Sequence, residues 1–147
     1  KKTIKKPDII LLEGWCINAS PIPLKLLNNS INILEKRFDN KNSWREYYNC
    51  NLKKLYKDLF DLLDYSIYLK IPNYNKVFEW RKMQEKKNMK KQNIKNFEIE
   101  DDKLKIFIMH YEKLTKWMLK DMPQKTDVCL NIGNNHRFSG ILFNRSI

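Results

Sequence analysis

The sequence feature that most constrains the fold is an uninterrupted apolar run at residues 9–12, which follows Asp8 and stops at Glu13 and Gly14. Such a run, with no polar alternation, is typical of a strand buried on both faces of a parallel sheet. Ligands bind at the carboxyl ends of the strands in open parallel sheets. The run therefore predicts a strand over residues 8–12 that ends at a ligand-facing edge with Glu13.

The rest of the chain alternates helical and strand patterns. A helix is expected from about residue 24 to 38, and a second from 43 to about 63, where Ser43 and Glu46 have the spacing of a capping box. Residues 66–71 alternate like a strand. A charged helix follows over 75–91, then a polar connection and an amphipathic helix from 101 to Pro123. Strands are expected at 127–132 and 138–143, so the order predicts one α/β layered domain.

Composition narrows the class of protein. The net charge of +12 raises the possibility of nucleic-acid binding, but only five of the 29 basic residues are arginines and the lysines are scattered. Arginine is the residue of bidentate phosphate and guanine recognition, so a nucleic-acid-binding module is the least favoured function. No apolar run is long enough to span a membrane. The three cysteines are far apart, which argues against a zinc site and fits reduced thiols in the cytoplasm.

Several segments resemble, in order, a known group of enzymes. Residues 8–16, DIILLEGWC, are similar to the "D-hydrophobic-EGW" strand of P-loop kinases of the D-glycerate 3-kinase type, within the uridine kinase and phosphoribulokinase group. The likeness continues in the stretch 31–35, in Ser43-Trp44-Arg45, and in the helix that follows. Residues 78–85, FEWRKMQE, resemble the "W-R-x-x-Q-E" lid segment, and 107–115, FIMHYEKLT, resemble the "F-V-x-x-Y-E-x-L-T" helix. Together the EGW and WRxxQE segments are specific for the family.

The resemblance implies a fold and a set of roles. The fold would be part of a P-loop NTPase-type three-layer α/β structure with a mostly parallel sheet, and residues 73–100 would form a helical lid. Glu13 would take the Walker-B-like position and hold Mg²⁺, directly or through water. Arg81 would neutralise charge on the transferring phosphoryl group, and Asn134, Asn135 and His136 would border the adenine of ATP.

Each of these residues also has a plainer interpretation. Glu13 could be a solvated carboxylate, and the cationic segment around Arg81 and Lys82 could be an exposed helix face. Gln84 and Glu85 match the lid motif and could simply anchor the lid. Asp8 and Asp127 begin their predicted strands, away from the ligand-facing edge, and are expected to be structural.

One part of the family pattern is missing from this sequence. No G-x-x-x-x-G-K-[ST] phosphate-binding loop occurs, and the three glycines cannot supply one. Residues 1–147, which begin with Lys1, are therefore expected to be the C-terminal portion of a single P-loop kinase domain. The predicted function is ATP- and Mg²⁺-dependent phosphoryl transfer to a hydroxyl of a small metabolite, with D-glycerate as the first candidate. The chain would act as part of a longer or split kinase whose N-terminal portion carries the phosphate-binding loop. The alternative is a catalytically inactive remnant or partner subunit.

Overall fold

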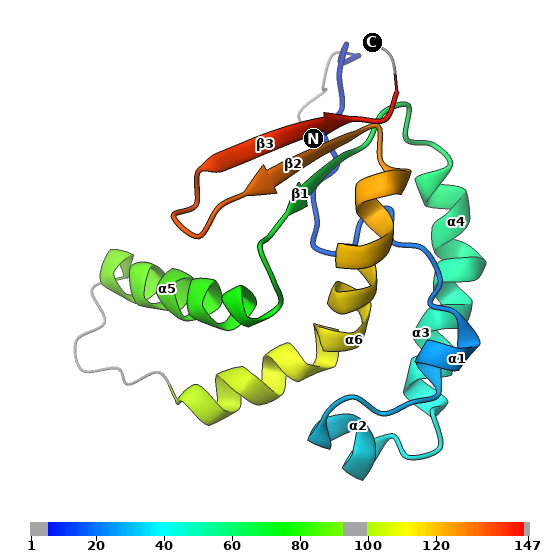
Figure 1. Ribbon diagram of the computed structural model, residues 1–147, viewed down its shortest axis with the longest axis vertical. Helices are drawn as coiled ribbons and strands as arrows, with labels where there is room; N and C mark the ends of the chain where they lie inside the picture. The colour runs from blue at the N-terminus through cyan, green and yellow to red at the C-terminus, as the bar shows by residue number, and fades with distance from the viewer. Residues whose placement is uncertain (1–5, 93–99, 146–147) are drawn as a thin grey trace.

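The computed structural model describes residues 6–92 and 100–145 as a mixed α/β arrangement (Figure 1). The elements in chain order are α1 (Leu24–Leu27), α2 (Ile33–Phe38), α3 (Ser43–Lys53), α4 (Leu55–Phe60), β1 (Ile67–Lys70), α5 (Asn75–Lys91), α6 (Asp101–Lys125), β2 (Val128–Ile132) and β3 (Phe138–Phe143).

The three strands form a small mixed sheet in the order β1-β2-β3. β1 runs parallel to β2, with Ile67 opposite Val128, and β3 returns antiparallel to β2 as a hairpin. The strands expected at 66–71, 127–132 and 138–143 are therefore confirmed. The sheet is smaller and less parallel than expected, because only one of its two strand pairings is parallel.

The strand predicted at residues 8–12 is wrong for the structure as described. The segment makes no backbone hydrogen bond to the described residues, and Ile9, Ile10 and Leu11 are 81%, 81% and 91% exposed. An apolar run becomes a strand only where a neighbouring strand can accept its backbone groups. No described strand lies in that position, so the run stays extended and exposed.

Three helix boundaries differ from expectation for local reasons. The helix expected at 24–38 is divided into α1 and α2, and the one expected at 43–63 breaks at Lys54, whose φ and ψ are −111° and −82°. The amides of Trp44 and Arg45 at the start of α3 bond to the Asp39 carboxylate, and the side chain of Ser43 makes no capping bond. The last helix passes Pro123 and ends at Lys125.

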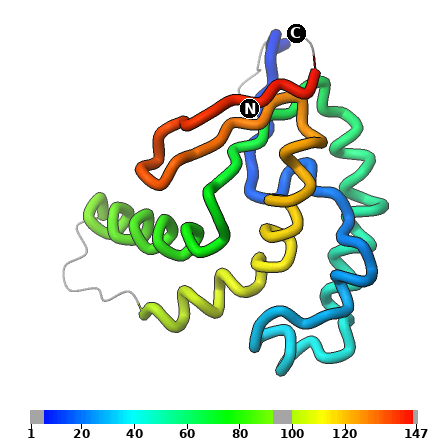
Figure 2. The backbone as a smooth tube through the Cα atoms, viewed as in Figure 1, coloured from blue at the N-terminus to red at the C-terminus, as the bar shows by residue number. Residues whose placement is uncertain are grey.

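Helix α6 contributes residues to both hydrophobic core clusters. Its residues Met118 and Met122 pack with Ala19 and Leu52 in one core cluster, and Leu104 and Ile108 pack with Val77 in another. The backbone trace shows α6 between the α5 arm and the α1–α4 region (Figure 2).

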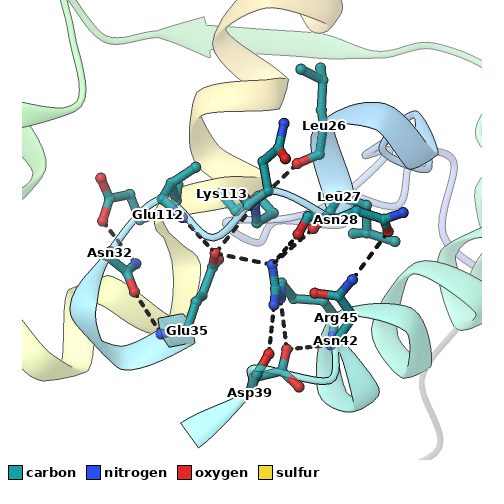
Figure 3. A network of polar contacts seen from close by, with 12 residues as sticks. Leu26, Leu27, Asn28, Asn32, Glu35, Asp39, Asn42, Arg45, Glu112 and Lys113 are labelled. Carbon is teal, nitrogen blue, oxygen red and sulfur yellow. Dashed lines mark hydrogen bonds and ion pairs between the residues drawn. The ribbon is translucent and has the colours of Figure 1, made fainter. Parts of the chain in front are cut away.

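A buried polar network ties the region of α1, α2 and α3 to α6 (Figure 3). Arg45 is completely buried, with its Nε 2.7 Å from Asp39 and its Nη1 3.5 Å from Glu35. It also donates to the carbonyls of Leu27 and Asp39. The Lys113 ammonium, from α6, lies 3.3 Å from Glu35. It also donates to the carbonyls of Leu26, in α1, and Asn29, just after α1. Burial lowers the pKa of Lys113, and the nearby Glu35 carboxylate opposes that shift.

Replacing Arg45 should therefore be strongly destabilising. Arg45→Met leaves Asp39 buried without its cation and Glu35 with Lys113 alone, and breaking a buried pair in this way costs about 3–5 kcal/mol of unfolding free energy. Urea denaturation followed by circular dichroism measures it. The control is Lys57→Met, which removes an exposed pair with Asp61 and should hardly change the unfolding free energy. A similar midpoint shift for both variants would contradict the role of the network.

Candidate functional site

The carboxyl ends of the two parallel strands border a hollow of about 260 Å³. Its lining comes from the end of β1 and the residues after it, from the end of β2 and the turn that follows, and from β3: Lys70, Ile71, Pro72, Asn131, Ile132, Gly133, Asn134 and Ser139. This is the edge at which ligands bind in open parallel sheets. The lining combines one cation with side-chain amides and a hydroxyl, a composition suited to an anionic or strongly polar ligand.

Three residues lie side by side at these strand ends. Lys70 is paired with Asn131, and Asn131 with Gly140 of β3. A Cβ at Gly140 would lie 3.3 Å from Nδ2 of Asn131, so a larger residue would crowd this amide. Neither Lys70 nor the Asn131 amide makes a side-chain hydrogen bond to the described residues, which leaves both free to bind a ligand.

The turn between β2 and β3 is tightly organised. The Gly133 amide donates to the Arg137 carbonyl at 2.7 Å, and the His136 amide donates to the Gly133 carbonyl at 3.0 Å. His136 has a left-handed φ of 61°. Oδ1 of Asn135 accepts from the Arg137 amide, so this side chain is used within the turn. Of the three residues predicted to border adenine, Asn134 lines the hollow, whereas Asn135 and His136 do not.

The His136 ring joins the turn to α5. It lies against the indole of Trp80, with ring centroids 4.1 Å apart. Trp80 precedes Arg81 in the predicted lid motif, so the structure brings this part of the lid segment to the loop predicted to border a nucleotide.

Arg81 itself is engaged along α5 and against α6. Its Nη2 lies 2.5 Å from the Glu85 carboxylate, and its Nη1 donates to Oε1 of Gln84 at 2.9 Å. The guanidinium lies 5.6 Å from the centre of the Phe107 ring, within the range of a cation–π contact. Its Nε is buried and has no hydrogen-bond partner among the described residues. Gln84 and Glu85 thus contact the arginine within α5 itself.

Glu13 is exposed and makes no ion pair or hydrogen bond with the described residues. Its neighbour Trp15 is fixed, because the Trp15 indole stacks on Tyr111 at 5.0 Å and its Nε1 donates to Oγ1 of Thr115. Trp15 therefore holds the chain next to Glu13 against α6. Among the described residues, Glu13 contacts neither the hollow nor Arg81.

Segments that carry the sequence resemblance meet along one helix. The Tyr111–Thr115 stretch of α6 receives Trp15 from the EGW segment. Asn32, the N-cap of α2, donates to the Glu112 carboxylate at 2.9 Å and the Met109 carbonyl at 3.0 Å. One turn earlier, Phe107 receives Arg81 and contacts Tyr111. Patterns far apart in the sequence are thus joined by direct contacts.

Sequence reasoning missed three residues of the hollow: Lys70, Asn131 and Ser139. The rule that selected Glu13 could have selected Lys70 and Asn131, because both lie at the carboxyl ends of correctly predicted parallel strands. Ser139 had no comparable signal, since its place depends on the β2–β3 pairing.

Within residues 6–92 and 100–145, no three His, Cys, Asp or Glu side chains are grouped so that they could hold a metal ion. No helix in the described part of the chain has the length and apolar character needed to cross a membrane.

Comparisons with known proteins add no assignment. No family model, curated protein or solved structure matches the chain.

Asp127 sets the parallel register on which the hollow depends. Its Oδ2 accepts from both the amide and the hydroxyl of Ser66, each at 2.7 Å, at the end of the strands opposite the hollow. These bonds hold the pKa of Asp127 below its usual range, with help from Arg145 at 3.6 Å. The expectation that Asp127 is structural is confirmed.

This lowered pKa predicts an acid-dependent stability. The carboxylate stabilises the fold above the unfolded-state pKa of about 3.9, and that contribution is lost as the pH falls through the lower folded-state value. Asp127→Asn should therefore melt below the wild type at pH 7, and the gap should narrow progressively as the pH falls below about 3.9. A gap that is constant from pH 7 to pH 3 would contradict the role of the carboxylate.

Proposed function

We propose that this chain supplies the lid, the acidic residue Glu13 and a wall of the nucleotide site of an ATP-dependent small-molecule kinase. The reaction is phosphoryl transfer to a hydroxyl of a small metabolite, with D-glycerate as the first candidate acceptor. A separate or preceding polypeptide segment supplies the phosphate-binding loop, and the two together form the P-loop NTPase-type three-layer fold.

The observation that carries the proposal is the convergence of the resembling segments on α6. Trp15, Asn32 and Arg81 come from three such segments, and each contacts the FIMHYEKLT segment directly. These contacts keep the EGW turn, the α2 start and the lid in fixed relation. Segments that resemble the kinase family in sequence therefore also contact one another in the structure.

The chemistry of the strand ends supports the same function. Lys70, Asn131 and Asn134 offer a cation and amide groups suited to a negatively charged group. The Trp80–His136 ring contact lies in the turn that follows Asn134. At about 260 Å³ the hollow is below the roughly 300–1,000 Å³ typical of small-molecule sites. It therefore suits one wall of a nucleotide site rather than a complete site.

Glu13 suits the proposed magnesium role in its chemistry. Mg²⁺ is usually bound through one or two carboxylates, several waters and the phosphates of the substrate, and does not need an all-protein cage. An exposed carboxylate without a partner among the described residues matches that pattern. With ATP bound, Mg²⁺ would neutralise phosphate charge, and the chain's part would be to orient the ion's water shell through Glu13.

The direct test supplies the missing loop. The coding sequence upstream, in frame or in a neighbouring frame, is searched for G-x-x-x-x-G-K-[ST], and its product is combined with this chain. ATP-dependent phosphorylation of D-glycerate and of other small hydroxy acids is then measured. The chain alone should show little thermal stabilisation by Mg-ATP, and low-micromolar binding by the chain alone would contradict a phosphate site formed elsewhere. An inactive combination that still binds ATP would support the remnant alternative.

In the restored enzyme, Arg81→Ala should lower kcat by roughly 10³-fold, the lower range for arginines that stabilise the transferring phosphoryl group. Arg81→Lys should restore little, because an ammonium does not reproduce the planar fork of donors. Steady-state kinetics measure both. Lys86→Ala, which changes an exposed lid cation outside the motif, is the control. Normal turnover in Arg81→Ala would return Arg81 to the interpretation as part of an exposed helix face.

Glu13→Gln tests the magnesium role with little change of shape. A carboxylate beside a polyphosphate is favourable only when a cation lies between them, since like charges repel. In the restored enzyme the substitution should lower kcat and raise the Mg²⁺ concentration for half-maximal turnover. Its melting temperature should stay unchanged, because Glu13 has no described contact to lose. An unaltered magnesium titration with full activity would show that Glu13 is only a solvated carboxylate.

A further inference from the structure

Lys70 differs from the other cations that the fold withdraws from solvent. Six lysine and arginine side chains in the described part of the chain are buried or half-buried: Arg45, Lys70, Lys76, Arg81, Lys82 and Lys113. Five of them have a carboxylate oxygen within 4.0 Å, whereas Lys70 has none among the described residues. Withdrawing a charge from water is unfavourable unless an opposite charge or a set of hydrogen bonds replaces the water. The place of Lys70 therefore calls for a partner from outside the chain.

Lys70 lies on the α6 side of the sheet, at the edge that borders the hollow. Alternate residues of a strand face the same side, so Lys70 shares a face with Tyr68, and Asn131 shares it with Cys129. Tyr68 packs against the core cluster that contains residues of α6. The next residue in the same row is Gly140 of β3, where a Cβ would lie 3.3 Å from Nδ2 of Asn131. The cation and the amide are thus neighbours on one face, and no side chain at position 140 covers the amide.

The lining of the hollow offers donors and no negative charge. Among the described residues that line it there is no Asp or Glu, and Lys70 is the one that carries a formal charge. An ammonium has three hydrogen-bond donors, and a side-chain amide has two. Lysine binds a carboxylate or a phosphate as a point charge, so it does not require one fixed ligand geometry. At about 260 Å³ the hollow has room for either group on a small molecule.

We propose that Lys70 and Asn131 form an oxyanion subsite, in which the ammonium and the amide bind a carboxylate or phosphate group of a small ligand. A neutral analogue without this group is rejected, because the ammonium would stay partly desolvated with no opposite charge. For its part in catalysis the subsite rests on the proposed function. A carboxylate bound here belongs to the acceptor, which is then a hydroxy acid, and a phosphate bound here belongs to the nucleotide.

The test titrates the isotope-labelled full chain with D-glycerate, inorganic phosphate and glycerol at equal ionic strength, without nucleotide, and follows the backbone amides by NMR. Both anions should shift the amides of residues 70, 71 and 131–134 at millimolar concentrations, and glycerol should not. A stronger response to D-glycerate assigns the subsite to the acceptor, and a stronger response to phosphate assigns it to the nucleotide. Equal responses to D-glycerate and glycerol, or no response to either anion, would overturn the proposal.

Lys70→Met should weaken the binding of both anions about 10-fold or more, because one hydrogen bond with a charged group is lost. The matched control is Lys120→Met, which removes the same charge from an exposed lysine of α6 that does not line the hollow. This control should bind the anions like the wild type. Equal weakening in the two variants would reveal only a general attraction of anions to a basic chain, and would reject the subsite.

Asn131→Asp tests the subsite without removing the lysine. It places a carboxylate beside Lys70, in register across β1 and β2, and so supplies the opposite charge that Lys70 lacks. The new ion pair should abolish the response to both anions, whereas the melting temperature should stay unchanged or rise, because opposite charges now face each other. Anion binding that survives in this variant would contradict the role of Lys70.

The outcomes separate the subsite from the proposed kinase, because the titration needs neither nucleotide nor the phosphate-binding loop. Anion binding that depends on Lys70, together with a restored protein that transfers no phosphoryl group, would keep the subsite and reject the kinase. An active restored enzyme whose KM values for ATP and acceptor are unchanged in Lys70→Met would keep the kinase and reject the subsite.

Discussion

The fold depends on a pair of buried cations and the carboxylates that face them. Arg45 and Lys113 face the carboxylates of Glu35 and Asp39, and their remaining donors are satisfied by carbonyls of the loop around α1. Helices as short as α1 and α2 are not stable by themselves, because nucleation is costly and few bonds repay it. Their position is set by these ion pairs and by the Asn32 bonds to α6. The network therefore fixes the otherwise irregular N-terminal half on α6.

The position of that half decides where the candidate functional residues lie. The Arg45 network holds residues 26–45 on one side of α6, and the Trp15 stack on Tyr111 holds the preceding turn nearby. On the other side, Tyr74 donates to the Ile108 carbonyl and Arg81 lies over Phe107, which fixes the start of α5. Contacts made by α6 thus determine the relation between the segment after Glu13 and the lid. The hollow depends instead on Asp127 and Ser66, which set the register of the strands.

The sequence predicted elements whose pattern is local and missed those that depend on distant partners. β1, β2 and β3 were recognisable because alternation, a proline and a turn mark them within a few residues. The run at 9–12 has an even stronger pattern, and it is no strand here because pairing requires a neighbour that these described residues lack. The motif Ser43-Trp44-Arg45-Glu46 indicated a helix start correctly, but nothing local shows that Arg45 is buried, since its partners lie up to 18 residues away. Lys70 and Asn131 could have been selected from strand ends, whereas the Trp80–His136 contact joins positions 56 residues apart and has no local signal.

The state of Arg81 gives the lid a physical requirement. Glu85 and Gln84 occupy Nη2 and Nη1, the same donors that a transferring phosphoryl group would use. In water this pair contributes little, because both side chains are about one-third exposed. If Arg81 has the proposed role, a phosphate with its higher charge would have to replace Glu85 at these donors, and exclusion of water would strengthen the new contact. The indole of Trp80, held on His136, keeps the neighbouring residue of α5 near the strand ends during this exchange. The proposed role of Arg81 therefore requires that it give up its contacts with Glu85 and Gln84.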